Sequence, residues 1–117
     1  MLKVYAYSGC GTCRKALKFL EEHGVAHRVI PIREQPPTPA ELKRMLAAYH
    51  GDARKLFNTS GQDYRALGLG AKLATLSSAD ALALLAQNGN LVKRPFVLAP
   101  DRAHVGFRDE DWNTSAS

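Results

Sequence analysis

The sequence predicts an α/β protein with a small mixed β-sheet of about four strands, helices on its faces and a helical insertion in the middle of the chain. Three observations support this prediction. The chain begins with a strand–helix–strand pattern, its middle is rich in helix signals, and two short apolar segments near its end flank a turn. A length of 117 residues suits one domain with its own core. We expect this single domain to span residues 1–112, with the insertion at about 38–90 and a disordered tail at 113–117.

The first unit is a strand, a helix and a second strand. Apolar and polar residues alternate over Met1–Tyr7, which is the period of a half-buried strand. Helical spacing starts at Thr12, and Gly24 stands where glycine commonly ends a helix. Val25–Ile32 is rich in β-branched residues and predicts the next strand. A strand–helix–strand unit of this length favours two parallel strands.

The middle of the chain predicts three helical segments. Thr38 is followed by a proline and, three residues on, by Glu41, which is the pattern of a capping box at the start of a helix. A short helical turn is expected over Gln62–Leu67. We expect Ser78 to cap a further helix, which ends at the Asn-Gly-Asn run of residues 88–90.

The end of the chain predicts a β-hairpin. Phe96–Leu98 and His104–Phe107 are the expected strands, joined by a proline-containing turn. Asp109–Trp112 suggests a last helical turn, with Phe107 and Trp112 as packing residues. The following tail has nothing to bury.

Composition narrows the functional classes. Sixteen Lys and Arg residues against 11 Asp and Glu residues give a net charge of +5, which attracts oxyanions, acidic thiols or an acidic protein surface. The sequence has no block of like charges and no basic stripe interleaved with aromatic residues, so direct nucleic-acid binding is not expected. No apolar stretch approaches the roughly 20 residues of a membrane span, so we expect a cytoplasmic protein without membrane contact.

The motif that carries chemistry is Cys10-Gly11-Thr12-Cys13, at the predicted junction of the first strand and the first helix. Unpaired backbone N–H groups and the helix dipole favour a thiolate at such a position. Arg14 and the neighbouring lysines add positive charge. We therefore expect Cys10 to be the attacking thiolate, Arg14 to activate it, and Cys13 to resolve the adduct by closing a disulfide.

Two other interpretations of the cysteine pair stay open. The cysteines can be incidental, one exposed and one packed, although their place after a strand argues against this. A structural zinc site needs four ligands, and the histidines available to complete it are His23, His27, His50 and His104. His23 and His27 lie on either side of Gly24, which disfavours a shared helical face, so no metal is expected.

Two further segments carry candidate binding residues. A cis bond between Arg94 and Pro95 would let the preceding backbone pair with an extended thiol substrate, and Arg94 would then bind an anion near the dithiol. A trans proline beside a solvated arginine is the simpler interpretation of the dipeptide alone. The polar segment 58–61, which begins with Asn58, offers amide and hydroxyl donors to an anion or is only a loop.

Several motifs, taken together and in order, resemble one known family. They are Cys10-Gly11-Thr12-Cys13-Arg14-Lys15-Ala16, Leu56–Gly61 with Tyr64-Arg65 and Leu67-Gly68-Leu69, Leu91–Pro95, and Val105–Arg108 with Trp112. The chain resembles the arsenate reductase (ArsC)/Spx/MgsR family, a glutaredoxin-like branch of the thioredoxin fold with a helical insertion. The resemblance implies a thioredoxin-like fold and a cis Pro95 that faces the cysteine site.

In the arsenate reductase branch, the first cysteine attacks arsenate, arginines hold the oxyanion, and glutathione resolves the adduct. This implies Cys10 as nucleophile, with Thr12, Arg94 and Pro95 on the substrate side. Asn58 stands where these enzymes carry a further arginine, which implies a weaker oxyanion site.

Arg108 is at best a substitute for the last arginine of those enzymes. In the Spx branch, the cysteine pair is a redox switch, and the protein binds the carboxyl-terminal domain of the RNA polymerase α subunit. We predict an arsenate reductase-like oxidoreductase, with an Spx-like regulator as the alternative and a plain thiol–disulfide reductase as a third candidate. We expect no bound cofactor, and glutathione with glutaredoxin, or thioredoxin, as the external reductant.

Overall fold

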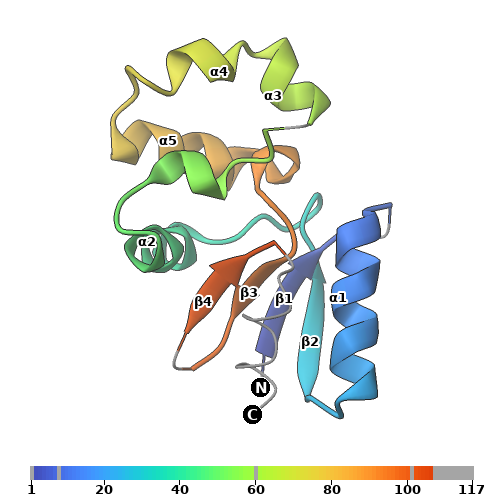
Figure 1. Ribbon diagram of the computed structural model, residues 1–117. Helices are drawn as coiled ribbons and strands as arrows, with labels where there is room; N and C mark the ends of the chain where they lie inside the picture. Colours follow the sequence, from blue (N-terminus) through green and yellow to red (C-terminus); the bar gives the residue numbers. More distant parts are fainter. Residues whose placement is uncertain (1, 8, 60, 101, 107–117) are drawn as a thin grey trace.

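A four-stranded mixed sheet forms the base of the computed structural model, which describes residues 2–7, 9–59, 61–100 and 102–106 (Figure 1). Its strands are β1 (Leu2–Ala6), β2 (His27–Pro31), β3 (Phe96–Leu98) and β4 (Ala103–Val105), and their order in the sheet is β2-β1-β3-β4. β1 pairs with β2 in parallel, and the other two pairs are antiparallel. The predicted mixed sheet with a parallel first pair and a closing hairpin is confirmed.

Helix α1 (Gly11–Glu22) covers one face of this sheet. The alternate residues of β1 on that face, Val4 among them, pack with Val97 and with the buried α1 residues Cys13, Ala16 and Leu20. The helix ends at Glu22 with His23 as its C-cap, and Gly24 follows, as predicted, with a φ of +65° that other residues rarely adopt.

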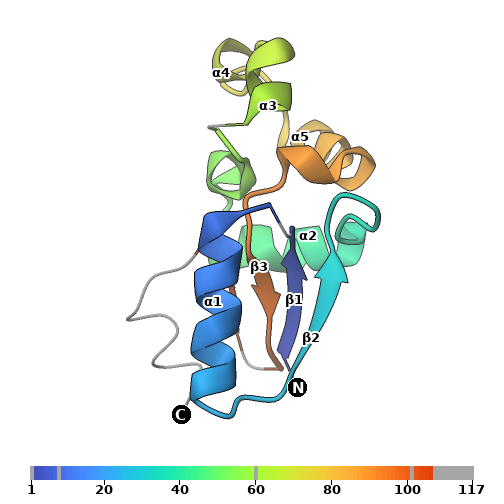
Figure 2. The ribbon, with the colours of Figure 1, turned by 90° about the vertical axis from the view of Figure 1, so that its right-hand side faces the viewer.

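The opposite face is covered by α2 (Pro39–Ala48), and the core on this side continues into the rest of the insertion. Figures 1 and 2 show α1 and α2 on different sides of the sheet. The predicted capping box is present, since the Glu41 N–H donates to Thr38 Oγ1 at 3.2 Å and the Thr38 N–H donates to Glu41 Oε1 at 3.0 Å. Glu41 also accepts from Lys3 Nζ and from the Tyr5 hydroxyl, each at 2.6 Å, which fastens α2 to the sheet.

The prediction that β1 is half-buried is wrong for Tyr5. This side chain is only 3% exposed and meets the ring of Phe96 edge-on, with 5.7 Å between the ring centroids. Alternation predicts a wet second face, but the insertion folds back over that face and makes it the larger part of the core.

Beyond α2, the insertion contains short helices: η1 (Ala53–Leu56), α3 (Gln62–Ala66), α4 (Leu69–Lys72), α5 (Ser78–Gln87) and η2 (Gly89–Leu91). The sequence did not predict η1, α4 and η2. Ser77, not Ser78, caps α5, because its side chain accepts from the Asp80 N–H. The insertion stands over the end of the sheet where β1 stops and α1 begins (Figure 1).

Two side chains of α2 hold the closing hairpin. Arg44 Nη2 donates to the carbonyls of Ala99 and Arg102. Tyr49 Oη accepts from the Val105 N–H at 2.9 Å. The strand β4 begins one residue earlier than predicted, and the expected elements from Phe107 onward, including the tail, lie outside the described residues. Within the described ranges, no helix is long and apolar enough to cross a bilayer.

Candidate active site

The cysteine pair lies where β1 gives way to α1. Cys10 is the N-cap residue of α1, and its Sγ accepts a hydrogen bond from the Cys13 N–H at 3.2 Å. The Cys10 N–H donates to the Tyr7 carbonyl at 3.0 Å, and the Arg14 N–H donates to the Cys10 carbonyl at 3.1 Å. The sulfur of Cys10 therefore occupies the position that a capping oxygen takes in other helices.

The two thiols differ in burial. Cys10 is partly exposed, whereas Cys13 is 1% exposed and packs between the sheet and α1. Burial, and after it the interaction with Cys10, raise the pKa of the Cys13 thiol to about 12, although the Tyr7 backbone and the charge of Arg94 act in the opposite direction. At neutral pH Cys13 is a protonated thiol, and Cys10 is the sulfur that solvent reaches.

Tyr7 turns its ring back toward the cysteine loop. A Cβ added to Gly9 would lie 2.5 Å from Tyr7 Cε2 and 2.8 Å from Cζ. Glycine is needed at position 9 for this placement of the ring, because any side chain there would push the ring away.

Arg94 lies near enough to the cysteine pair for its charge to lower the pKa of Cys13, and Pro95 follows it in the chain. The peptide bond between them is cis, and Pro95 is buried. The guanidinium of Arg94 lies over the Tyr7 ring, with Cζ 5.2 Å from the ring centroid. Its Nη1 is buried and finds no hydrogen-bond partner among the described residues. This guanidinium therefore keeps one buried donor that no described residue uses.

Asn58 is brought beside Arg94 by backbone pairing. The Asn58 N–H donates to the Leu91 carbonyl at 2.7 Å, and the Lys93 N–H donates to the Leu56 carbonyl at 2.8 Å. Asn58 and Arg94 line one pocket of about 230 Å³, so the structure joins these two predicted site residues.

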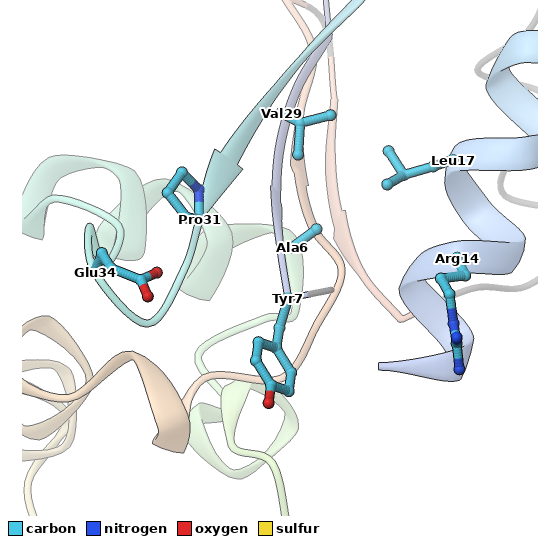
Figure 3. Close-up of a pocket in the computed structure, with 7 residues that line it drawn as sticks. All are labelled: Ala6, Tyr7, Arg14, Leu17, Val29, Pro31 and Glu34. Carbon is cyan, nitrogen blue, oxygen red and sulfur yellow. The ribbon is translucent and has the colours of Figure 1, made fainter. Parts of the chain in front are cut away.

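Thr12 and Arg14 are exposed on the first turn of α1. Arg14 borders a different, mostly apolar groove between α1 and β2, where Leu17 and Val29 point toward one another (Figure 3). Tyr7 lines both this groove and the Arg94 pocket. Thr12 borders neither, and Arg108 lies outside the described residues.

Five residues of the Arg94 pocket were not among the predicted site residues: Tyr7, Arg33, Gln62, Asp63 and Asn90. They come from just after β1, from the segment after β2, from α3 and from η2, and no motif connects them. The one feature of the sequence that relates to this pocket is the glycine at position 89. A Cβ there would overlap the Ile32 carbonyl, so only glycine lets η2 approach the backbone beside Arg33. In the parts of the chain that the structure describes, no three His, Cys, Asp or Glu side chains gather as a metal site.

The fold and the site define a class: a thioredoxin-like α/β protein with a cysteine pair at the start of its first helix. The chain belongs to the ArsC family, whose model matches residues 5–115.

Curated relatives and a solved structure agree with that membership. An uncharacterized protein, YusI from Bacillus subtilis, is 46% identical over 111 residues, covering 95% of this chain and 94% of the relative. The global transcriptional regulator Spx of Enterococcus faecalis is 29% identical and covers 95% and 83%. An arsenate reductase of Rhizobium meliloti is 32% identical and covers 83% and 68%. The crystal structure of an ArsC family related protein from Bacteroides fragilis superposes with a TM-score of 0.91 at 39% identity and covers 97% and 95%.

Proposed function

We propose that this protein is a thiol oxidoreductase of the arsenate reductase type, in which Cys10 is the nucleophile and Cys13 the resolving thiol. The observation that carries the proposal is the asymmetry of the pair. Cys10 Sγ is accessible and accepts from a backbone N–H at the start of α1, while Cys13 is buried three residues away. A helix start stabilises negative charge on the first sulfur, and burial keeps the second one protonated until it is needed.

The reaction balances within the pair. The Cys10 thiolate attacks the arsenic of arsenate, an S–As bond forms, and one oxygen leaves as water. Cys13 loses its proton and attacks Cys10 Sγ, the S–As bond breaks, and its electron pair stays on arsenic. Arsenate is thereby reduced to arsenite, and the dithiol is oxidised by two electrons to a disulfide. Glutathione with glutaredoxin, or thioredoxin, returns the dithiol to its reduced form.

The same pair exchanges with an organic disulfide. Cys10 attacks one sulfur of the disulfide and releases a thiol. Cys13 then attacks Cys10 Sγ and releases the second thiol. We assign Arg94, Pro95 and Asn58 to the substrate side and Arg14, with Thr12 beside it, to the α1 side of the nucleophile.

The test is arsenate-dependent NADPH oxidation by the reduced protein. The reaction is coupled in one assay to glutathione and glutaredoxin and in another to thioredoxin. We expect turnover in at least one assay and its loss in Cys10→Ser. Wild-type protein that turns over neither arsenate nor a neutral disulfide would contradict the proposal.

A second candidate is an Spx-like redox regulator that binds the RNA polymerase α subunit. It is favoured by the regulators named Spx among the relatives and by the exposed cations Arg14, Lys15 and Lys18 next to the cysteine pair. The test is retention of the α subunit carboxyl-terminal domain on immobilised protein, reduced and oxidised. Retention in one redox state supports the regulator, and no retention in either state rejects it.

A further inference from the structure

The Arg94 pocket contains charges of both signs. It opens beside Tyr7, the residue whose carbonyl holds the Cys10 N–H, and lies on the insertion side of that ring. At about 230 Å³ it is smaller than the roughly 300–1,000 Å³ of sites that enclose a whole small molecule. It therefore has room for one end of a ligand.

Two guanidinium groups supply the positive charge. Arg33 Cζ lies 4.7 Å and Arg94 Cζ 5.2 Å from the centroid of the Tyr7 ring. Neither arginine forms an ion pair with a carboxylate of the described residues, and Arg94 Nη1 is buried without a hydrogen-bond partner there. Both guanidinium groups line the same pocket and neither has a carboxylate partner there, so a carboxylate bound in the pocket is attracted by both.

Asp63 supplies the negative charge. Its Oδ2 accepts from Asn88 Nδ2 at 3.0 Å and from Asn90 Nδ2 at 3.3 Å, which holds the carboxylate at the pocket wall. Its Oδ1 receives no hydrogen bond from the residues that the structure describes. This carboxylate pairs well with an ammonium group.

We propose that this pocket binds the zwitterionic amino-acid end, an α-carboxylate and an α-ammonium group, of the small thiol compound whose sulfur exchanges with Cys10. Arg33 and Arg94 bind the carboxylate, and Asp63 binds the ammonium. This inference rests on the proposed thiol chemistry and adds the recognition of its co-substrate. In the exchange, Cys10 attacks the disulfide form of this compound: a mixed disulfide with the bound half forms, the S–S bond of the compound breaks, and the other half leaves as a thiol.

Symmetrical disulfides that differ only in their charged groups test the proposal. Cystine and glutathione disulfide carry both an α-carboxylate and an α-ammonium group, close to the sulfur in cystine and farther from it in glutathione disulfide. 3,3′-Dithiodipropionate carries carboxylates alone, cystamine carries ammonium groups alone, and hydroxyethyl disulfide is neutral. For each compound, the rate constant for oxidation of the reduced variant is divided by that of the wild type. The reactivity of the leaving thiol is the same in both rate constants and cancels in this ratio.

Two variants remove one charge each. We expect Arg33→Gln to slow the carboxylate-bearing disulfides about tenfold and to leave cystamine and hydroxyethyl disulfide unchanged. We expect Asp63→Asn to slow compounds with an ammonium group by a similar factor and to accelerate 3,3′-dithiodipropionate. The matched controls, Arg28→Gln on β2 and Asp80→Asn on α5, remove the same charges from exposed positions outside the pocket.

The outcomes separate the two proposals. Ratios that do not depend on the charges of the disulfide, or that the control variants reproduce, overturn the pocket assignment and leave the thiol chemistry intact. A protein that is oxidised by no disulfide overturns the pocket assignment, and one that also fails to reduce arsenate overturns both proposals. A binding measurement does not depend on the thiol chemistry. S-methylglutathione added to the Cys10→Ser protein should shift the NMR signals of the Arg33 and Arg94 side chains. In a Cys10→Ser protein that also carries Asp63→Asn, these signals should not shift. Shifts that are equal in both backgrounds, or absent, contradict the proposal.

Discussion

Tyr7 separates two regions that are built in different ways. On its α1 side, the cysteine pair comes from one uninterrupted segment in which a strand, a turn and a helix start follow each other. On its insertion side, the pocket is assembled from separate segments that carry Arg33, Asn58, Asp63 and Arg94. The reacting sulfurs thus depend on local structure, whereas recognition depends on how the insertion packs on the sheet. Changes in one region should therefore leave the other largely intact.

The largest expected effect concerns chemistry alone. Cys10→Ser should lower turnover of arsenate or disulfide by a factor of about 10³ or more, because the second cysteine, Cys13, is buried. Cys13→Ala should keep the first attack and accumulate a mixed disulfide on Cys10, which mass spectrometry of the intact protein detects. The alanine avoids burying a hydroxyl. If Cys13→Ala still catalysed repeated turnover in the absence of glutathione, Cys13 would not be the resolving thiol.

The next effect concerns the insertion side. Gly89→Ala places a Cβ on the Ile32 carbonyl, so the backbone must move, and we expect a loss of roughly 2–4 kcal/mol in the free energy of unfolding. Denaturant unfolding measures it. Gly70→Ala in α4 is the matched control, since its Cβ meets only ordinary contacts with Tyr64. Equal stability of the two variants would refute the close approach of η2 to the segment that carries Arg33.

A smaller effect should appear at the boundary. Gly9→Ala displaces the Tyr7 ring, whose far edge is the obstacle, so the ring should move at little cost in stability. We expect the preference for charged over neutral disulfides to fall several-fold, which is the effect of weakening one contact between an arginine and the Tyr7 ring. Gly11→Ala is the control, because a Cβ there meets nothing within 4 Å. Unchanged selectivity in Gly9→Ala would exclude the ring from the pocket.

The smallest effect is one of stability and pH. Burial raises the pKa of Glu41, but hydrogen bonds from Lys3, Tyr5 and the Thr38 backbone outweigh it and leave the pKa lowered. The Glu41 carboxylate therefore stabilises the fold above the ordinary glutamate pKa, and this stabilisation is lost as the pH falls through the lowered value.

Glu41→Gln should accordingly cost about 1 kcal/mol at neutral pH and almost nothing once the pH lies below the lowered pKa of Glu41. Urea unfolding at several pH values measures the difference. Glu21→Gln, on the exposed side of α1, should show no such pH dependence. A cost for Glu41→Gln that is the same at both pH values would contradict the role of the charge.

These contrasts explain how far the sequence could predict the molecule. The cysteine site was predictable because Cys10, Gly11 and Cys13 lie within one turn, and caps such as Thr38 with Glu41 are equally local. The pocket was not, because Arg33 and Asp63 become neighbours only when the insertion packs. The burial of Tyr5 has the same origin, since alternation along β1 carries no information on what covers its second face.

The central claim is the division of labour between an accessible nucleophile and a buried resolving thiol. Brief alkylation of the reduced native protein at neutral pH, followed by peptide mass spectrometry, tests it most directly. Because burial raises the pKa of Cys13 to about 12, the account predicts that Cys10 is modified while Cys13 stays intact until the protein unfolds. Modification of Cys13 in the native protein at the same rate as Cys10 would contradict it.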